Sequence, residues 1–493
     1  MKKVPLTWEN GTCERTQTTR TGSTFTVKTT RSYPAHHIDT RPVNAVAQAG
    51  GVLLTEAAHV TGLSLALGRE LAEFAHPSST HRPSKVLTDL ALTLAVGGDS
   101  VSDLDTLRAE PTIYGTIASA PTVSRTMSRL AASPEKALAA IAAATASARA
   151  RTWELAGVHA PNHAATARNP LVIDMDATLV TAHSEKDDAK PTWKKGFGFH
   201  PLLAFIDHGP TGTGEYVAGL LRPGNAGSNT ASDHIELTQQ ALTQLPAGKS
   251  RPGKSVLIRA DTAGGTHAFL EFLTTRRLSY SVGFQLPEHM PELYETLTEN
   301  SAWEPAYDTA GDGLREGADV AELTSLLDLT GWPEGLRVIV RRERPHPGAQ
   351  LRFDDVEGYR LTAFATNTRV PGVHLAELEA RHRARARCED RIRIAKDTGL
   401  RNFPFKKFAH NHLWLAIVGL ASQLEAWKAL LAHPEDEVRR WEPKRLRLRV
   451  YSVPAVIARS ARRVIIHVKD TAACAGVIIA AITRLRGLPA PSG

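Results

Sequence analysis

Two aspartates stand two residues apart in an apolar, β-prone run, Leu171 to Val180, which reads LVIDMDATLV. Side chains alternate along a strand, so Asp174 and Asp176 are expected to project from the same face. Burying an uncompensated carboxylate is costly, because the charge loses its hydration. Basic side chains, backbone donors or a metal ion must therefore neutralise that face of the strand.

Asp261 is a third acidic residue at a position suited to chemistry. It ends a second apolar run, KSVLIRAD, and is followed by TAGGTHAFLEFLTTRR, a predicted helix that a glycine pair opens. Strand ends that lead into helices are where α/β folds place their chemistry. Asp261 is therefore a candidate partner of the first two aspartates.

The segment Arg381 to Leu400, RHRARARCEDRIRIAKDTGL, carries a glutamate among basic residues. On one continuous α-helix at about 100° per residue, His382, Arg385, Glu389 and Lys396 fall within an arc of roughly 60°. One stripe thus presents a carboxylate beside a histidine, an arginine and a lysine. The alternative for such an arginine-rich segment is an amphipathic helix with a solvated basic face.

Carboxylates from separate elements are what two-metal phosphoryl transfer requires, since they must converge on two divalent ions roughly 4 Å apart. Asp176 from the first strand, Asp261 from a later strand end and Glu389 from a helix meet that requirement. These residue types and positions therefore indicate a candidate two-metal site.

The same residues resemble the motifs of the DDE transposases of the insertion-sequence 4 superfamily, most closely the insertion-sequence 1380 group. The family motif for the third carboxylate is Tyr, two residues, Arg, three residues, Glu, six residues, Lys, and this chain has His382, Arg385, Glu389 and Lys396 at that spacing. His382 stands where the family usually has Tyr. Asp176-Ala-Thr178 matches the family's D-x-T, Asp261 matches its second carboxylate, and the resemblance extends over roughly residues 45 to 465.

The resemblance implies an α/β fold, an RNase H-like catalytic core interrupted by a mostly β insertion, with helical N-terminal and C-terminal regions. It also implies cut-and-paste transposition, in which the protein binds the terminal repeats of an insertion sequence and catalyses Mg²⁺-dependent DNA cleavage and strand transfer. The expected partners are transposon-end and target DNA and, on DNA, a second copy of the chain. The alternatives are a catalytically inactive, transposase-derived DNA-binding protein and an RNase H-like nuclease that does not join ends.

Roles follow for single residues from the same resemblance. Asp176, Asp261 and Glu389 would bind two Mg²⁺ ions, for which Mn²⁺ would substitute. Arg385 and Lys396 would hold phosphates next to the cut. His382 would contact a phosphate or be a buried structural histidine, and Asp174 would support the site or replace Asp176 as the ligand.

The expected insertion carries further candidates for DNA binding. Trp303 or Trp332 would stack on a flipped base, although a tryptophan in a β-rich segment is more often part of a core. Arg341, which shares a strand with Arg342 and Arg344, would lie against phosphates; an exposed basic edge strand is the alternative.

The elements that must position these residues follow from the pattern along the chain. Apolar runs at 171–180, 200–209 and 214–224 resemble an antiparallel meander, and 231–245 predicts a helix before the strand that ends on Asp261. The predicted organisation is a flexible arm (1–45), a helical, DNA-binding N-terminal domain (46–165), the first part of the core (166–276), the β insertion (277–372), the second part of the core with Glu389 (373–430) and a basic helical C-terminal region (431–493).

The N-terminal domain is predicted to be helical from three patterns. Gly51 to Ala75 repeats apolar residues at helical spacing, a second helix starts at a Ser84 cap and stops at Gly97-Gly98, and an Ala-rich helix spans Pro134 to Ala156. The segment APTVSRTMSRLAA places Arg125 and Arg129 on a short helix, an arrangement common in DNA-binding domains.

Composition limits the class of protein. The 493 residues carry a formal net charge of +8 and a pI near 9.4, which favour an anionic partner. Cys13, Cys388 and Cys474 lie far apart without a C-x-x-C pair, so neither a disulfide framework nor a structural zinc site is expected. The basic charge and the absence of a disulfide pattern are consistent with a bacterial cytoplasmic, nucleoid-associated protein. The polar N-terminus lacks a signal-peptide pattern and the apolar run 472–482 is too short to span a bilayer, so no membrane partner is expected.

Overall fold

The computed structural model describes residues 43–183, 185–246, 253–308, 313–346, 348–350, 355–461 and 463–491. The chain divides into two compact units, Met1–Asn44 and Ala45–Gly493. The expected N-terminal arm, residues 1–45, lies almost wholly outside the described residues. The second unit holds every other residue that the sequence singled out and is described below.

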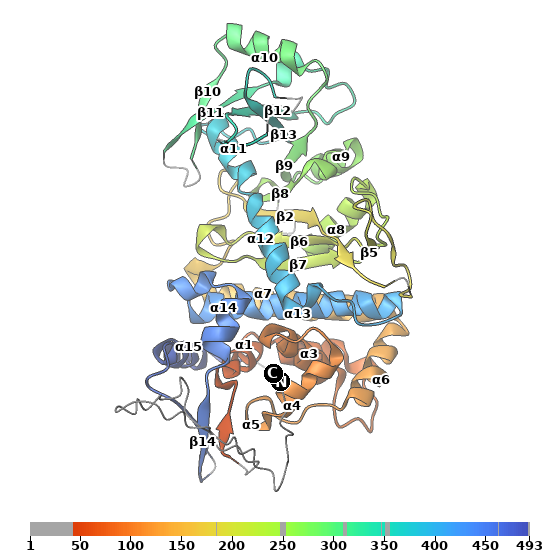
Figure 1. The fold of residues 1–493 in the computed structure, drawn as a ribbon, viewed down its shortest axis with the longest axis vertical. Coiled ribbons are helices and arrows are strands. Elements are labelled where there is room, and N and C mark those ends of the chain that lie inside the picture. Colours follow the sequence, from red (N-terminus) through yellow and green to blue (C-terminus); the bar gives the residue numbers. More distant parts are fainter. Residues whose placement is uncertain are drawn as a thin grey trace, which may run out of the picture. The chain divides into compact units, whose positions relative to one another are not determined.

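A mixed sheet forms the centre of this unit (Figure 1). The described residues contribute nine strands to it, in the spatial order β10-β11-β12-β13-β9-β8-β2-β6-β7. In that order the strands are Glu304–Tyr307, Leu314–Glu322, Arg337–Glu343, Arg360–Thr366, Ser279–Phe284, Val256–Ala260, Leu171–Ala177, Leu202–Ile206 and Glu215–Leu220. The α/β class expected from the sequence is confirmed.

The strands around β2 have two kinds of neighbour. β2, β6 and β7 pair antiparallel in succession, which confirms the expected meander. β8 and β9 lie parallel to β2 and to each other, and the crossovers that parallel pairing requires contain α8 (Ala231–Thr243) and α9 (His267–Thr275). All residues of β6 and β8 are buried, as expected for strands covered on both faces.

The strands that follow residue 277 extend the same sheet. β9 pairs parallel with β8 on one side and antiparallel with β13 on the other, and α10 (Met290–Glu299) belongs to the same stretch. The proposed insertion boundary at residue 277 remains a prediction. The expectation of an exposed basic edge strand at Arg341 is wrong, because β12 is hydrogen-bonded on both sides, to β11 and β13.

Residues 46–165 are mainly helical in the structure. The helices are α1 (Val52–Val60), α2 (Leu63–Glu70), α3 (Pro83–Val96), α4 (Leu104–Arg108), α5 (Pro111–Tyr114), α6 (Ala120–Ala131) and α7 (Pro134–Ala156). The pattern from Gly51 to Ala75 is divided at Gly62, whose φ of 73° is left-handed. The predicted Ser84 cap is wrong, since Arg82 precedes the helix and Pro83 takes its first position, where its missing N–H costs nothing.

The long helix α13 (Phe408–Ala432) joins the helical region to the sheet. It packs against β7 of the sheet, against α7 beside it and against α3 (Figure 1). Among the described helices it alone is long and apolar enough to cross a membrane, yet 94% of its apolar window is buried inside the structure. A helix that is apolar all round fits the interior of a large protein, and α13 has that position here.

The C-terminal region is only partly helical. It contains α14 (Pro443–Leu446) and α15 (Ala475–Gly487), but β14 (Ala455–Ser460) and β15 (Arg463–Val468) form a hairpin that pairs with β1 (Ala45–Val46). The prediction of a helical region is therefore wrong for these strands, whose β-branched residues suit an extended backbone. Cys388 and Cys474 are buried free thiols, and Cys13 lies outside the described residues.

A fully buried carboxylate, Glu215 of β7, ties the sheet to the helices. Its oxygens accept hydrogen bonds from Arg149 Nε of α7 at 2.5 Å and from the Trp427 indole of α13 at 3.2 Å, and they lie 3.2 Å from His208 Nε2. Burial alone would raise the pKa of Glu215, but Arg149 and His208 outweigh it and lower the pKa to about 2. The carboxylate is thus ionised and satisfied inside the protein.

Replacing Glu215 with Gln is expected to lower the free energy of unfolding by about 3–5 kcal/mol at pH 7, because it leaves Arg149 charged and unpaired in the interior. The folded-state pKa is below the ordinary 4.5, so this contribution is present above pH 4.5 and is lost as the pH falls toward about 2. Urea denaturation of wild type and variant between pH 7 and 3 measures the difference. Glu435→Gln, at a side chain that is 82% exposed, is the control. A difference that does not shrink at low pH would contradict the assignment.

Candidate functional site

Asp176 and Asp261 stand at the same end of two neighbouring strands. In the parallel pair β2 and β8, Met175 lies opposite Ala260, and the next residue of each strand is one of the two aspartates. Asp261 also caps a short 3-10 helix, Thr262–Gly264, by accepting a hydrogen bond from the Ala263 N–H at 3.1 Å. Parallel pairing therefore brings together two residues that are far apart in the sequence.

Glu389 comes to this place on a helix that crosses the strands. The predicted single helix is two, α11 (Leu375–Arg383) and α12 (Ala386–Ala395), with a turn at Ala384 and Arg385 between them. α12 packs against β2 and carries Glu389 in its first turn (Figure 1). His382 therefore does not share a helix with Glu389, whereas Arg385 directly precedes α12, the helix that carries Glu389.

The charges at this site are only partly compensated. Burial raises the pKa of Asp176 from 3.8 to about 6, and the charges of Asp261 and Glu389 add to the rise. Two interactions oppose it: Arg385 Nη1 lies 3.8 Å from Asp176 Oδ2, and the Ala177 N–H donates to Oδ1 at 2.8 Å. Asp176 is thus an ionisable group held near two other carboxylates with one distant arginine.

The three side chains suit a divalent cation by their chemistry. Carboxylate oxygens are the ligands that Mg²⁺ and Mn²⁺ prefer, and a cation would relieve the repulsion that raises the pKa of Asp176. In the part of the chain that the structure describes, no three His, Cys, Asp or Glu side chains are grouped as a ready-made metal site. Glu389 is exposed and Asp176 is mostly buried, so the third carboxylate is the more solvated of the two.

Asp174 has a different environment from Asp176 on the same strand. It is fully buried, and its two oxygens accept hydrogen bonds from Arg259 at 2.5 and 2.8 Å. Arg391 also donates to it. Arg259 and Arg391 thus neutralise the charge of Asp174, as the sequence analysis required. This pairing favours a supporting role for Asp174 and leaves Asp176 as the candidate ligand.

The basic residues of the predicted stripe are separated by the structure. Arg385 faces Asp176, whereas Lys396 begins the turn Lys396–Leu400 at the other end of α12. Burial and the charges of Arg401 and Lys194 lower the pKa of Lys396. A lysine among other cations is well suited to bind an anion such as a phosphate.

His382 and Arg341 are engaged within the protein. The His382 ring is stacked on Phe364 with centroids 4.4 Å apart, and its Nδ1 is 2.9 Å from Ser281 Oγ. Burial lowers the pKa of His382 to about 3, so the ring is neutral at pH 7. Arg341 is paired with Glu343 at 2.6 Å and with Glu379 at 3.3 Å. These contacts favour structural roles, and DNA contacts by either residue remain predictions.

One predicted aromatic residue contacts the start of α9, the helix that follows Asp261 in the sequence. Trp332 is stacked on His267, the first residue of α9, with ring centroids 3.8 Å apart, and the His267 ring also contacts the Gly331 carbonyl at 2.9 Å. Trp303 packs instead against Arg342, whose guanidinium carbon lies 4.4 Å from the centroid of the Trp303 ring. Of the two tryptophans, Trp332 is the one that contacts the helix after Asp261.

Asp207 is a residue that the sequence interpretation missed. It directly follows β6 and accepts hydrogen bonds from Arg259, Arg387 and Arg391. Its signal was present, because Asp207 ends the apolar run HPLLAFID just as Asp261 ends KSVLIRAD. A search for every aspartate at a predicted strand end would have found it.

The comparisons with known proteins show the family of the chain and a distant likeness to a solved structure. The family model described as "Transposase DDE domain group 1" matches residues 33–490. No curated protein matches the chain. The cryo-EM structure of a piggyBac transposase synaptic complex with hairpin DNA is similar with a TM-score of 0.39 and 8% identity, over 81% of this chain and 79% of that one.

Replacing Asp176 with Asn is expected to stabilise the metal-free protein. Because the folded-state pKa is raised, ionising Asp176 costs the folded state about 2–3 kcal/mol, a cost that grows from about pH 4 and is complete above about pH 6. In urea denaturation with EDTA, the free energy of unfolding of the variant relative to wild type should be larger at pH 7.5 than at pH 4.5. Asp390→Asn, at a neighbouring side chain that is 55% exposed, should show no such increase. A variant less stable than wild type at pH 7.5 would refute the raised pKa.

Proposed function

The chain belongs to the transposase DDE domain family, group 1, and we propose that it is a cut-and-paste transposase of the insertion-sequence 4 superfamily, nearest to the insertion-sequence 1380 group. It binds the terminal repeats of its element, cleaves them with divalent metal ions and joins the ends to target DNA. One observation carries the proposal: Asp176 and Asp261 follow paired residues of parallel strands, within electrostatic range of Glu389.

Asp176, Asp261 and Glu389 would hold the metal, Mg²⁺ or Mn²⁺, in this proposal. When bound, two such ions activate the attacking oxygen and stabilise the leaving oxygen at a phosphodiester. The protein's own part is to keep three carboxylates together and ionised, which for Asp176 requires a pH above about 6 or a cation nearby. Arg385, which lies 3.8 Å from Asp176, would pair with a phosphate oxygen next to the cut.

The finer features of the fold are part of the same proposal. The meander β2-β6-β7 with β8 parallel to β2 supports an RNase H-like core. The strands β9 to β13 lie within the proposed insertion, residues 277–372, and Trp332 is its candidate for stacking on a base. A dimer assembled on DNA and a bacterial cytoplasmic location complete the proposal.

The cleavage proposal predicts a dependence on each of three carboxylates. Asp176→Asn, Asp261→Asn and Glu389→Gln should each lower Mg²⁺-dependent nicking of terminal-repeat DNA by at least about a hundredfold, because each removes a charged ligand. Asp390→Asn is the matched control, since Asp390 follows Glu389 on the same helix and pairs at the surface with Arg393 at 3.0 Å. EDTA should abolish nicking. Cutting by the three variants at the wild-type rate would overturn the proposal. A strand-transfer assay with pre-cut ends distinguishes an enzyme that joins ends from a nuclease that only cuts.

A basic cavity in the helical region is a candidate surface for DNA. It has a volume of about 400 Å³ and lies between the segment after α2 and helix α6. Its lining residues are His76, Ser78, Ser79, Thr80, His81, Thr122, Arg125, Thr126 and Arg129, which are neutral or basic. The Arg125 and Arg129 side chains are exposed and lie one turn apart on α6. Guanidinium and hydroxyl groups of this kind contact the DNA backbone.

The double variant Arg125→Gln, Arg129→Gln is expected to weaken DNA binding evenly across sequences. Removing two phosphate contacts should reduce the slope of log affinity against log salt by about 1–2. Fluorescence anisotropy with terminal-repeat and unrelated duplexes at several salt concentrations measures this. Arg69→Gln, at a side chain that is 69% exposed and paired with Glu70, is the control. An unchanged slope in the double variant would exclude this cavity as a DNA-binding surface.

A further inference from the structure

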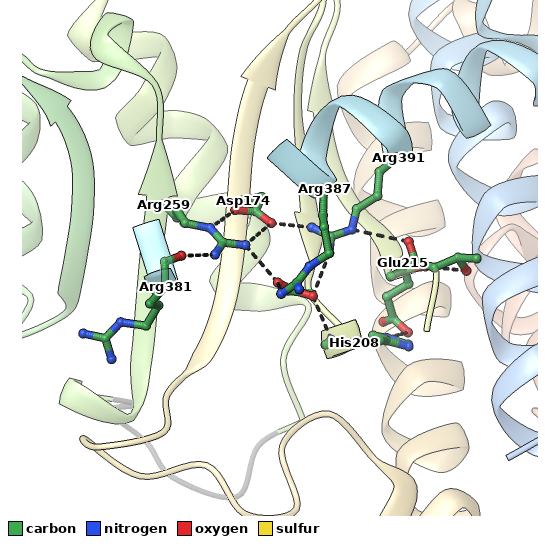
Figure 2. Close-up of polar contacts among 11 residues, drawn as sticks. Asp174, His208, Glu215, Arg259, Arg381, Arg387 and Arg391 are labelled. Atoms are coloured by element: carbon green, nitrogen blue, oxygen red, sulfur yellow. Dashed lines mark hydrogen bonds and ion pairs between the residues drawn. The ribbon is translucent and has the colours of Figure 1, made fainter. Parts of the chain in front are cut away.

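A buried ionic network, part of which Figure 2 shows, is built from residues of β2, β8 and α12 and from Asp207. At one centre is Asp207, which accepts hydrogen bonds from Arg259 at 2.8 Å, Arg387 at 2.7 Å and Arg391 at 2.7 Å. At the other is Asp174, to which Arg259 and Arg391 also donate. Arg259 and Arg391 therefore each bridge both aspartates.

The network joins every element that carries a candidate ligand. Asp174 is on β2 with Asp176, and Arg259 is on β8, the strand that Asp261 follows. On a strand, residues two apart share a face and lie about 6–7 Å from each other. On each strand, the network residue therefore lies two positions before the candidate ligand and on the same face: Asp174 before Asp176, and Arg259 before Asp261.

The helix is held on the flank opposite Glu389. Arg387 and Arg391 are one turn apart on α12, and Glu389 lies about 200° around the helix from Arg387. Cys388 is buried between the two flanks and is close enough to feel the charges of both Asp174 and Asp176. Because Arg387 and Arg391 hold one side of α12 in the network, the position of Glu389 on the opposite side of the helix is also fixed.

Contacts of the network also bracket the turn that carries Arg385. On one side Arg259 donates from Nη1 to the Arg381 carbonyl in the last turn of α11 (Figure 2). On the other side Arg387, in the first turn of α12, donates to Asp207. The position of Arg385 opposite Asp176 depends on both.

Stability alone does not explain why these groups are charged. Side-chain exposure is 0% for Asp174, 1% for Arg259, 3% for Arg391 and 5% for Asp207. Buried ion pairs of this kind are often no more stabilising than apolar side chains of similar size. What they add is direction, because bidentate arginine–carboxylate hydrogen bonds hold a fixed geometry.

We propose that Asp174, Asp207, Arg259, Arg387 and Arg391 are positioning residues, which set the spacing of the Asp176, Asp261 and Glu389 carboxylates and so the affinity of the site for divalent metal. The inference rests on the proposed function, because it takes those three carboxylates to be the metal ligands. Residues that support metal ligands in this way change metal affinity without contacting the ion.

Arg387 is the residue on which to test this, since its side chain is 36% exposed and within the network it contacts only Asp207. Arg387→Gln in the full chain is expected to weaken binding of Mn²⁺ alone, measured by electron paramagnetic resonance without DNA, by about 10–100-fold. The Mg²⁺ concentration for half-maximal nicking should rise by the same factor. Arg387→Lys should recover most of the affinity, because a lysine charge can still pair with Asp207.

Two comparisons make the result decisive. Arg393→Gln removes an arginine from the same helix that pairs only at the surface, with Asp390 and Glu442, and should bind Mn²⁺ like wild type. Asp207→Asn should weaken Mn²⁺ binding at least as much as Arg387→Gln; if it fails to fold, the Arg387 variants decide. The urea denaturation midpoint of Arg387→Gln should match that of Arg393→Gln.

The outcomes separate the two proposals. Wild-type Mn²⁺ affinity in Arg387→Gln, together with lost affinity in Asp176→Asn, would overturn the positioning role and leave the proposed function standing. Mn²⁺ binding that Asp176→Asn does not alter would overturn the proposed function itself. Weakened binding in Arg387→Gln with a lower denaturation midpoint and no recovery in Arg387→Lys would assign the network to stability alone.

Discussion

The acidic face of β2 is the constraint on which the rest of the structure depends. Two aspartates project from one face of a buried strand, and the protein neutralises them differently. Asp174 is paired permanently with Arg259 and Arg391, whereas Asp176 has one arginine at 3.8 Å and two carboxylates nearby. Asp174 and Asp176, two residues apart on the strand, thus differ in that the first carboxylate is fully paired and the second only partly compensated. In the proposed function, a divalent cation is the partner of Asp176.

Neutralising that face requires arginines from several elements, and their packing shapes the surrounding fold. Arg259 comes from the parallel neighbour β8, Arg387 and Arg391 come from α12, and Asp207 at the end of β6 completes the charges. The next residue, His208, belongs to a second buried cluster around Glu215, which reaches α7 and α13. Adjacent residues of one loop therefore connect the candidate site to the helices that support the sheet.

The sequence predicted the local elements better than their connections. Short apolar runs separated by Gly and Pro identified β2, β6 and β7, the run KSVLIRAD identified β8, and the Ala-rich pattern gave α7 its observed bounds, Pro134–Ala156. The sequence also singled out Asp176, Asp261 and Glu389, which the structure brings within electrostatic range. What it did not predict depends on tertiary contacts: the turn at Arg385, the stacking of His382 on Phe364, and the pairing of Arg341 with glutamates. Helical periodicity cannot distinguish one helix from two that continue almost in phase, nor an exposed arginine from one that meets a carboxylate distant in the sequence.

The division between fixed and exposed carboxylates follows from electrostatics. Asp176 and Asp261 are held by strand pairing, and their mutual repulsion already contributes to the raised pKa of Asp176. A third buried carboxylate would add to that repulsion where no water screens it. Glu389 avoids this cost because it is exposed on the flank of a helix whose opposite flank is anchored by Arg387 and Arg391. The anchored helix thus keeps the charge of Glu389 within electrostatic range of Asp176, while the exposed side chain keeps it in water.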